Sequence, residues 1–220
     1  MTLNKLSAII INTQVKEKGI MTITEYEQIK GLKYREYCDY LQKKYGIGLS
    51  DYMTKAWNKN RKCTRTNEGL IAHHKYEDCA IMLSTPEYAR NNPFEWQLAT
   101  NIVYCDYLEH LLLHILICEN PSANKNKNEE VGIGGVINFL VPELNDVYSG
   151  WETMQEWRRN CHNLIKNDKN VYLTLLKRFK QSCKNNYFYT ENCLYTSFNG
   201  EYGGWKVEQN MELFKEIEKL

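Results

Sequence analysis

The sequence has few residues that break or cross-link a chain, and it has no long apolar run. Only 4 of the 220 residues are proline and 12 are glycine, and with 43% hydrophobic residues the composition excludes collagen-like and disordered proteins. The apolar patch from Ala8 to Ile11 is too short for the core of a signal peptide or for a membrane span. We therefore expect a cytoplasmic protein that has no membrane partner.

Two kinds of motif are also missing. The 8 cysteines form no CxxC pair, and a chain of this length does not need disulfides to fold, so we expect reduced thiols. The glycines at 132, 134 and 135 lack the spacing of phosphate-binding loops. We assign this stretch no nucleotide role.

Neither sign of charge dominates, because 28 basic and 27 acidic residues leave a net charge of +1. The distribution is uneven, however. Residues 1–62 carry 12 basic and 6 acidic side chains, whereas residues 63–120 carry 3 and 8. Eight basic side chains lie between Arg158 and Lys184, where Asp168 is the one acidic residue. Two basic stretches therefore flank an acidic centre.

The length fits one domain of α+β class. Hydrophobic spacing predicts helices at 24–46, 49–60, 106–117, 151–166, 170–184 and from 208 to the end. Short apolar runs at 69–76 and 101–105 predict two strands, and the Asn-Gly pair at 199–200 predicts an aromatic β-hairpin within 187–205. Polar or proline-interrupted stretches at 78–100 and 120–130 predict loops.

We divide the chain into three segments. Residues 1–62 form a basic helical segment, residues 63–119 form a central core, and residues 120–220 form a helical region that carries the hairpin. Asp106 and Glu109 have the spacing of a capping box, which marks the start of the helix in the core.

Four of the five histidines gather in this core. His73 and His74 end the first strand and point to opposite faces of it, so they suit different tasks. His110 and His114 lie four residues apart on a helix and therefore share a face. Three imidazoles from a strand and a helix can close around one divalent cation, while the fourth stays free as a base. His162 lies outside this pattern, and we expect an ordinary surface or core residue there.

The order of these residues resembles the HNH endonucleases, which are also called ββα-metal or His-Me finger nucleases. The matching segments are HH at 73–74, NIVY at 101–104 and EHLLLHIL at 109–116. The pattern at the second strand and the helix is similar to that of phage-type homing enzymes, and the three candidate histidine ligands are similar to those of colicin-type DNases. The resemblance covers about 50 residues and implies a ββα-metal core embedded in a mainly helical domain.

The resemblance implies a role for each matching residue. His73, His110 and His114 match metal ligands, and His74 matches the general base. Asn101 matches the family asparagine, for which we favour bracing the loop beneath the base over ligating the metal. Two departures stand out: the gap of 27 positions between His74 and Asn101 is long, and Lys75–Asp78 replaces the usual Ile-Pro. Whether Glu77 or Asp78 joins the site or is solvated stays open.

The chemistry of phosphodiester hydrolysis fits these residue types. A neutral histidine accepts a proton near pH 7, and a bound cation stabilises the 3′ oxygen that leaves. Imidazole ligands suit Zn, Ni or Mn better than Mg, and three protein ligands leave a coordination position open. The resemblance implies products with 5′-phosphate and 3′-hydroxyl ends. We therefore expect a metal-dependent DNA endonuclease with one divalent ion.

Basic side chains outside the core are the candidates for binding double-stranded DNA. We predict DNA contacts from Arg158, Arg159, Lys177, Arg178 and Lys75. Further candidates on the two basic stretches are Lys166, Lys169, Lys180 and Lys184, and Lys43, Lys44, Lys59, Arg61 and Lys62. The competing interpretation is that these charges form solvated helix faces.

Three alternatives remain from the sequence. The chain can be a non-catalytic protein that binds nucleic acid or protein on a degenerate HNH scaffold. It can be a nuclease for RNA or single strands. His110 and His114 can also join two of Cys79, Cys105 and Cys118 in a closed structural zinc site. A restriction, homing or other phage role, the recognised sequence, and a monomer or dimer are not readable from the residues.

Overall fold

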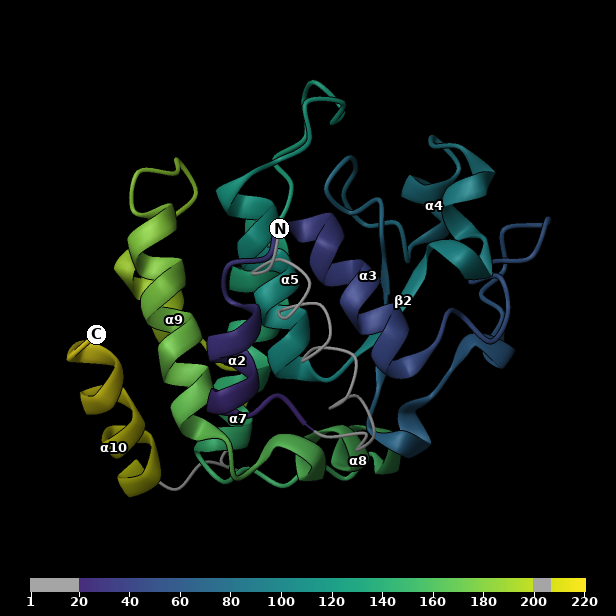
Figure 1. Cartoon of the computed structure of the whole chain (residues 1–220). Coiled ribbons are helices and arrows are strands. Elements are labelled where there is room, and N and C mark those ends of the chain that lie inside the picture. The colour runs from purple at the N-terminus through teal and green to yellow at the C-terminus, as the bar shows by residue number, and fades with distance from the viewer. Residues whose placement is uncertain (1–19, 200–206) are drawn as a thin grey trace, which may run out of the picture.

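The computed structural model describes residues 20–199 and 207–220, and within them two short strands pair beside a set of helices (Figure 1). Strand β1 (Ile71–His74) is antiparallel to β2 (Ile102–Cys105), with Ile71 opposite Cys105 and His74 opposite Ile102. All four residues of β2 are buried. The strand leads through Asp106 directly into helix α5.

Helix α5 (Tyr107–Glu119) is the central element of the fold. It begins at the expected capping box, in which the Asp106 carboxylate accepts from the amide of Glu109 and the Glu109 carboxylate accepts from the amide of Asp106. Ten of its thirteen residues are buried. A helix that is apolar nearly all round must be covered on every side, which explains its place in the core.

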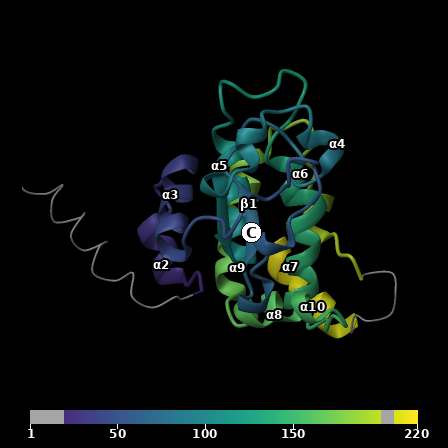
Figure 2. The ribbon, with the colours of Figure 1, turned by 90° about the vertical axis from the view of Figure 1, so that its right-hand side faces the viewer.

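The other helices surround α5 and the sheet. Figure 2 shows α2 and α3 on one side of α5 and β1, with α6 and α7 on the other side. A π-helical turn, residues Val136–Leu140, joins α6 to α7. The bounds are α2 (Ile23–Ile29), α3 (Tyr34–Tyr45), α4 (Pro86–Ala89), α6 (Ile133–Gly135), α7 (Val141–Tyr148), α8 (Glu156–Ile165), α9 (Lys169–Cys183) and α10 (Val207–Glu218).

The helix-rich arrangement with a small antiparallel sheet is consistent with the predicted α+β class. One hydrophobic cluster includes Tyr37, Leu111 and Leu175, which come from all three of the segments divided at 62 and 119. The segment boundaries themselves stay a prediction. No helix in the described part of the chain combines the length and the apolar character that crossing a membrane requires.

Two sequence-based expectations about helices are wrong. The helix expected at 24–46 is interrupted after Ile29, and α3 starts afresh at Tyr34. The helix expected at 49–60 is an extended turn instead, because Met53 bridges to Lys59 and the amide of Thr54 donates to the carbonyl of Asn58. Local backbone pairing replaced helical hydrogen bonds there.

The C-terminal half also differs from expectation. The β-hairpin expected at 187–205 is not confirmed, because Glu191–Tyr195 form a 3-10 helix and the described residues up to 199 contain no strand there. The rest of that expected hairpin, and the apolar patch at 8–11, lie outside the described residues. The sequence predicted no helix after Gly132, whereas residues 133–148 are helical. The absence of a nucleotide role for this stretch stays a prediction.

Candidate metal centre

Strand β1 separates the two adjacent histidines. Both side chains are fully buried, and their neighbours differ as the strand alternation requires. The His73 ring lies 5.1 Å from the ring of His110 and 5.2 Å from that of His114, centroid to centroid. The His74 ring instead lies 4.4 Å from the ring of Tyr52. The two side chains therefore have different surroundings, and the division of tasks between them stays a prediction.

Helix α5 brings the second pair together. His110 and His114 lie one turn apart, as their spacing predicts, and their ring centroids are 4.7 Å apart. The capping box fixes where the helix begins, and therefore which face of α5 meets β1.

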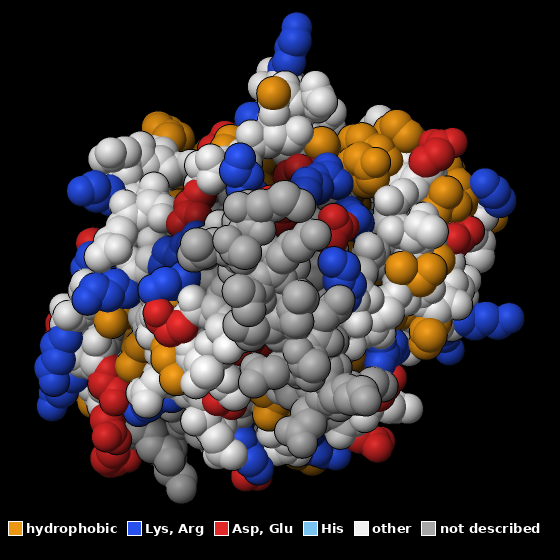
Figure 3. All heavy atoms as spheres, viewed as in Figure 1, with side chains coloured by type: hydrophobic (Ala, Val, Ile, Leu, Met, Phe, Trp, Pro, Cys, Tyr) orange, Lys and Arg blue, Asp and Glu red, His pale blue; other side chains and the backbone are white. Residues whose placement is uncertain are grey.

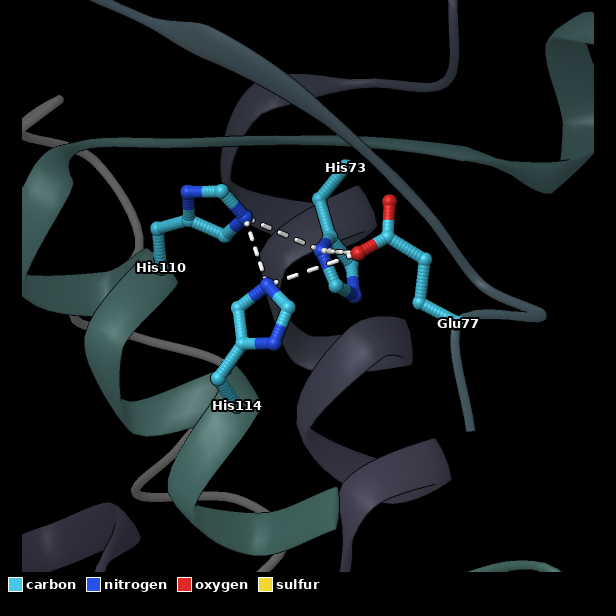
Figure 4. Close-up of side chains that lie close together, drawn as sticks. All are labelled: His73, Glu77, His110 and His114. Atoms are coloured by element: carbon cyan, nitrogen blue, oxygen red, sulfur yellow. Dashed lines mark hydrogen bonds and ion pairs between the residues drawn. The ribbon is translucent and has the colours of Figure 1, made fainter. Parts of the chain in front are cut away.

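Four donor atoms converge on one point, and one of them comes from Glu77 (Figure 4). His110 Nε2 is 3.1 Å from His73 Nδ1 and 3.1 Å from His114 Nε2. Glu77 Oε2 is 3.4 Å from His73 Nδ1 and 3.4 Å from His114 Nε2. Donors bound at about 2.0–2.1 Å around a tetrahedral ion are about 3.3 Å apart. The cluster of His73, Glu77, His110 and His114 can therefore hold a metal ion.

The set of donors settles one open question of the sequence. Glu77 belongs to the cluster, whereas the Asp78 carboxylate forms a bidentate ion pair with Arg35 at 2.7 and 3.0 Å. No cysteine belongs to the group that the described residues form. The alternative of a mixed histidine and cysteine zinc site therefore has no support.

Tyr34 holds His73 in the tautomer that a metal requires. The buried Tyr34 hydroxyl lies 2.8 Å from His73 Nε2 and donates to the carbonyl of His74 at 3.2 Å. Because the hydroxyl has a single proton, it satisfies both contacts when His73 Nε2–H is the donor. The lone pair of His73 is then on Nδ1, which faces the cluster. Burial keeps the pKa of Tyr34 well above its usual value of 10.0, so the hydroxyl keeps that proton.

The electrostatics put the donors in the protonation states that bind cations. Burial lowers the pKa of His73 to about 3, and it lowers the pKa values of His110 and His114 below the ordinary 6.5. Burial opposes ionisation of Glu77, but the neighbouring histidines, His73 first, outweigh it and hold the Glu77 pKa well below 4.5. Neutral imidazoles and an ionised carboxylate are ready ligands, because no proton must leave before a metal binds.

Two further features fit an ion at this point. His110 and His114 both present Nε2 to the cluster and keep Nδ1 buried on the other side of the ring. Gly135 in α6 packs against the His114 ring so closely that an added Cβ would lie 2.4 Å from it. Glycine at this position leaves the space that the ligand ring occupies.

His74 lies next to the cluster and outside it. Its Nε2 is 3.1 Å from Gln97 Oε1, and the Gln97 amide nitrogen donates to the carbonyl of Leu83, which fixes the orientation of the amide. The Gln97 contact therefore assigns a proton to His74 Nε2, and Nδ1 faces the carboxylate of Glu77. This Nδ1 lies 3.4 Å from Glu77 Oε1, on the side of the cluster.

Asn101 does not contact His74 or the cluster through any hydrogen bond that the described residues show. Its side chain donates to the carbonyl of Glu95 at 2.8 Å, and its own carbonyl accepts from the amide of Lys75. These bonds join the loop before β2 to the turn after β1. The side chain that contacts His74 Nε2 is that of Gln97, and the bracing role of Asn101 stays a prediction.

The five predicted DNA contacts differ in their surroundings. Arg158 forms a bidentate pair with Glu143, Arg178 with Glu119, and Lys75 pairs with Asp39 at 2.7 Å. Arg159 and Lys177 are exposed. His162, expected to be ordinary, is buried and lies against the Glu143 carboxylate.

Sequence reasoning missed Tyr34, Gln97 and Gly135. Tyr34 and Gln97 come from segments 39 and 23 residues distant from their histidine partners, and only the fold brings them there. Gly135 carried a weak signal, since a pair of glycines in an otherwise apolar stretch indicates close packing.

Comparisons with protein-family models, with curated proteins and with solved structures found no match to this chain.

Proposed function

We propose that this protein is a metal-dependent endonuclease of the HNH type that hydrolyses phosphodiester bonds of DNA. The observation that carries the proposal is the convergence of three imidazoles and one carboxylate beside a separate, oriented histidine. The order of two antiparallel strands followed by the helix that bears two of the ligands supports it. The similarity in HNH sequence pattern is the reason for choosing this reaction among metal-assisted hydrolyses.

Each residue of the site would have a separate role in the reaction. His73, Glu77, His110 and His114 would hold one divalent ion, which supplies Lewis-acid stabilisation of the negative charge on the leaving oxygen. His74 would accept the proton of the attacking water at Nδ1, the atom without a proton when Gln97 accepts from Nε2–H. Asn101 would keep the turn after β1 in place, because its carbonyl accepts from the amide of Lys75 while its side chain donates to the carbonyl of Glu95.

The donor set bears on the choice of metal. Four protein ligands fill a tetrahedral site, whereas an ion that takes six ligands keeps positions for water and a phosphate oxygen. We therefore favour Mn or Ni over Zn as the ion that supports cleavage.

The second candidate function is a metal-stabilised binding protein without catalysis. Two observations favour it: His74 is fully buried, and four donors can close a tetrahedral zinc site as in structural centres. In this case Zn binding would stabilise the fold, and His74 would be a packing residue between Tyr52 and Gln97.

The decisive experiment incubates the purified chain with plasmid, single-stranded DNA and RNA in Mn, Ni, Zn or Mg, beside His74→Ala. Metal affinity of both proteins is measured by calorimetry in parallel. We expect wild type to cleave DNA with Mn or Ni, and His74→Ala to bind the metal equally and lose at least about 100-fold in rate. Equal cleavage by both proteins would exclude His74 as the base. Metal binding without cleavage of any substrate would establish the second candidate.

A further inference from the structure

An exposed basic loop lies beside His74 and contacts its ring through Tyr52. We call residues 52–62 the lysine loop. Between residues 52 and 67 the sequence has no acidic residue. The loop's basic side chains are exposed, and none forms a salt bridge with any residue in the described parts of the chain: Lys55, Lys59, Arg61 and Lys62.

The lysine loop differs in this respect from the basic residues on the helices. The guanidinium groups of Arg158 and Arg178 each form an ion pair with a carboxylate of the same chain, and their side chains are only 15% and 20% exposed. A charge that is already paired must lose its partner before it binds phosphate, and this costs free energy. The cations of the lysine loop bind phosphate without breaking an ion pair.

Backbone hydrogen bonds hold the lysine loop in a defined conformation. Met53 bridges to Lys59, and the amide of Asn60 donates to the carbonyl of Tyr52. At the tip, the amide of Trp57 donates to the carbonyl of Thr54, and Trp57 has a φ of 60°. A left-handed backbone is unfavourable at a bulky residue and persists only where the surroundings impose it. The backbone of the turn therefore has a fixed conformation.

Aromatic rings alternate with these cations. Trp57 packs edge to face with Phe94, with centroids 5.4 Å apart, and Lys55 Nζ lies 3.7 Å from the Phe94 ring centre. Lys59 Nζ lies 5.1 Å from the Tyr52 ring centre. Figure 3 shows hydrophobic side chains gathered at the edge of the molecule around α4, with Lys and Arg side chains projecting beside them. The Tyr52 ring is buried, whereas the half-buried rings of Trp57 and Phe94 lie at the surface beside these cations. Nucleic acid strands bind such surfaces by charge and stacking.

Tyr52 connects the lysine loop to His74. Its ring lies 4.4 Å from the His74 ring, and its amide donates to the carbonyl of Gln97, whose side chain orients His74. Lys59 contacts the same Tyr52 ring. A phosphate bound at Lys59 would therefore lie one aromatic ring away from His74.

We propose that the lysine loop binds a nucleic acid strand whose bases are unpaired at this place, with phosphates on Lys55, Lys59 and Lys62 and a base against Trp57 and Phe94. Stacking requires an open base face, which an intact duplex hides, so the strand is single or locally melted. What happens to the bound strand rests on the proposed function, but the binding itself does not.

The test measures binding of a fluorescent single-stranded oligonucleotide by anisotropy, in EDTA so that no cleavage takes place. We compare the triple variant Lys55→Ala, Lys59→Ala, Lys62→Ala with the matched control Lys127→Ala, Lys215→Ala, Lys219→Ala, which removes three exposed lysines of the C-terminal half that are not among the predicted DNA contacts. We expect the loop variant to lose at least about tenfold in affinity and about 2 from the slope of log K against log salt. We expect the control to lose less than about threefold, and equal effects of both variants would overturn the proposal.

The stacking part has its own variants. Trp57→Ala should weaken single-strand binding at least about fivefold, and Trp57→Phe should restore most of it. Wild type should bind the single strand more tightly than the matching duplex. Equal binding of both, with no effect of Trp57→Ala, would overturn the choice of unpaired bases.

The two proposals fail in different ways. If the chain cleaves DNA but the loop variant binds and cleaves like wild type, the lysine loop is wrong and the nuclease stands. If nothing is cleaved but the loop variant alone loses binding, the nuclease is wrong and the lysine loop stands.

Discussion

Tyr34 illustrates how a single hydroxyl group prepares a metal ligand. It accepts from His73 Nε2–H and donates to the carbonyl of His74, so one atom fixes both the tautomer of His73 and the backbone at His74. Partners of this kind orient metal-binding rings and raise their affinity. Without the hydroxyl, His73 can turn its proton toward the cluster.

Tyr34→Phe should therefore weaken Mn or Ni binding by about 10- to 100-fold while the fold stays intact. Calorimetric titration measures the affinity, and circular dichroism checks the fold. Tyr37→Phe is the matched control, because the Tyr37 hydroxyl is buried on the same helix and has no hydrogen-bond partner among the described residues. Equal affinity of Tyr34→Phe and wild type would show that His73 is not oriented by this contact.

The glycine pair in α6 provides a second test at single residues. A Cβ at Gly135 would lie 2.4 Å from the His114 ring, whereas a Cβ at Gly134 has its nearest neighbour at 3.7 Å. Gly135→Ala should displace His114 and lower metal affinity at least about tenfold, and Gly134→Ala should leave it unchanged. Calorimetric titration measures the metal affinity of both variants. Equal affinities would place His114 outside the metal site.

At the scale of elements, the sequence predicted well where signals were local. The capping box at Asp106 and Glu109 and the spacing of His110 and His114 defined α5 and its ligand face, because a helix start and a four-residue repeat depend on nearby residues alone. The turn at 52–62 and the position of Gln97 depend on contacts between residues that are distant in the sequence. Local residue patterns do not predict such contacts.

The ion pair between Glu119 and Arg178 ties the end of α5 to α9. Burial raises the pKa of Glu119, but the bonds from Arg178 and Ser182 outweigh it, so the net pKa is below 4.5. A carboxyl with a lowered folded pKa contributes stability above its unfolded pKa, and that stability is lost as the pH falls through the folded value.

Glu119→Gln should therefore be less stable than wild type by about 1–3 kcal/mol at pH 7, and the difference should shrink as the pH falls below about 4.5. Urea unfolding of both proteins at several pH values measures it. A difference that stays constant down to pH 3 would mean that the charge of Glu119 is not what joins the two helices.

At the scale of the whole molecule, the metal site joins elements that lie far apart in the sequence. His73 and Glu77 lie at and just after β1, and His110 and His114 belong to α5. The net charge of +1 concealed the lysine loop, since average composition does not show which charges are already paired. Only the fold distinguished Arg158 and Arg178, held by carboxylates, from the unpaired lysines near His74.

An ion that binds only the folded chain must stabilise all of it. At a free metal concentration 100 times the Kd the gain is about 2.7 kcal/mol, which raises Tm by about 5–10 °C for a chain of this size. Thermal unfolding with and without Mn measures the shift. The double variant His110→Ala, His114→Ala should show no shift, and an equal shift in both proteins would locate the binding elsewhere.

X-ray absorption spectroscopy of the chain loaded with one equivalent of Ni addresses the central claim most directly, because it reports the atoms around the ion. We predict three imidazole nitrogens, with the remaining ligands all oxygen. Sulfur in the coordination shell, or fewer than three imidazoles, would contradict a centre made of His73, Glu77, His110 and His114.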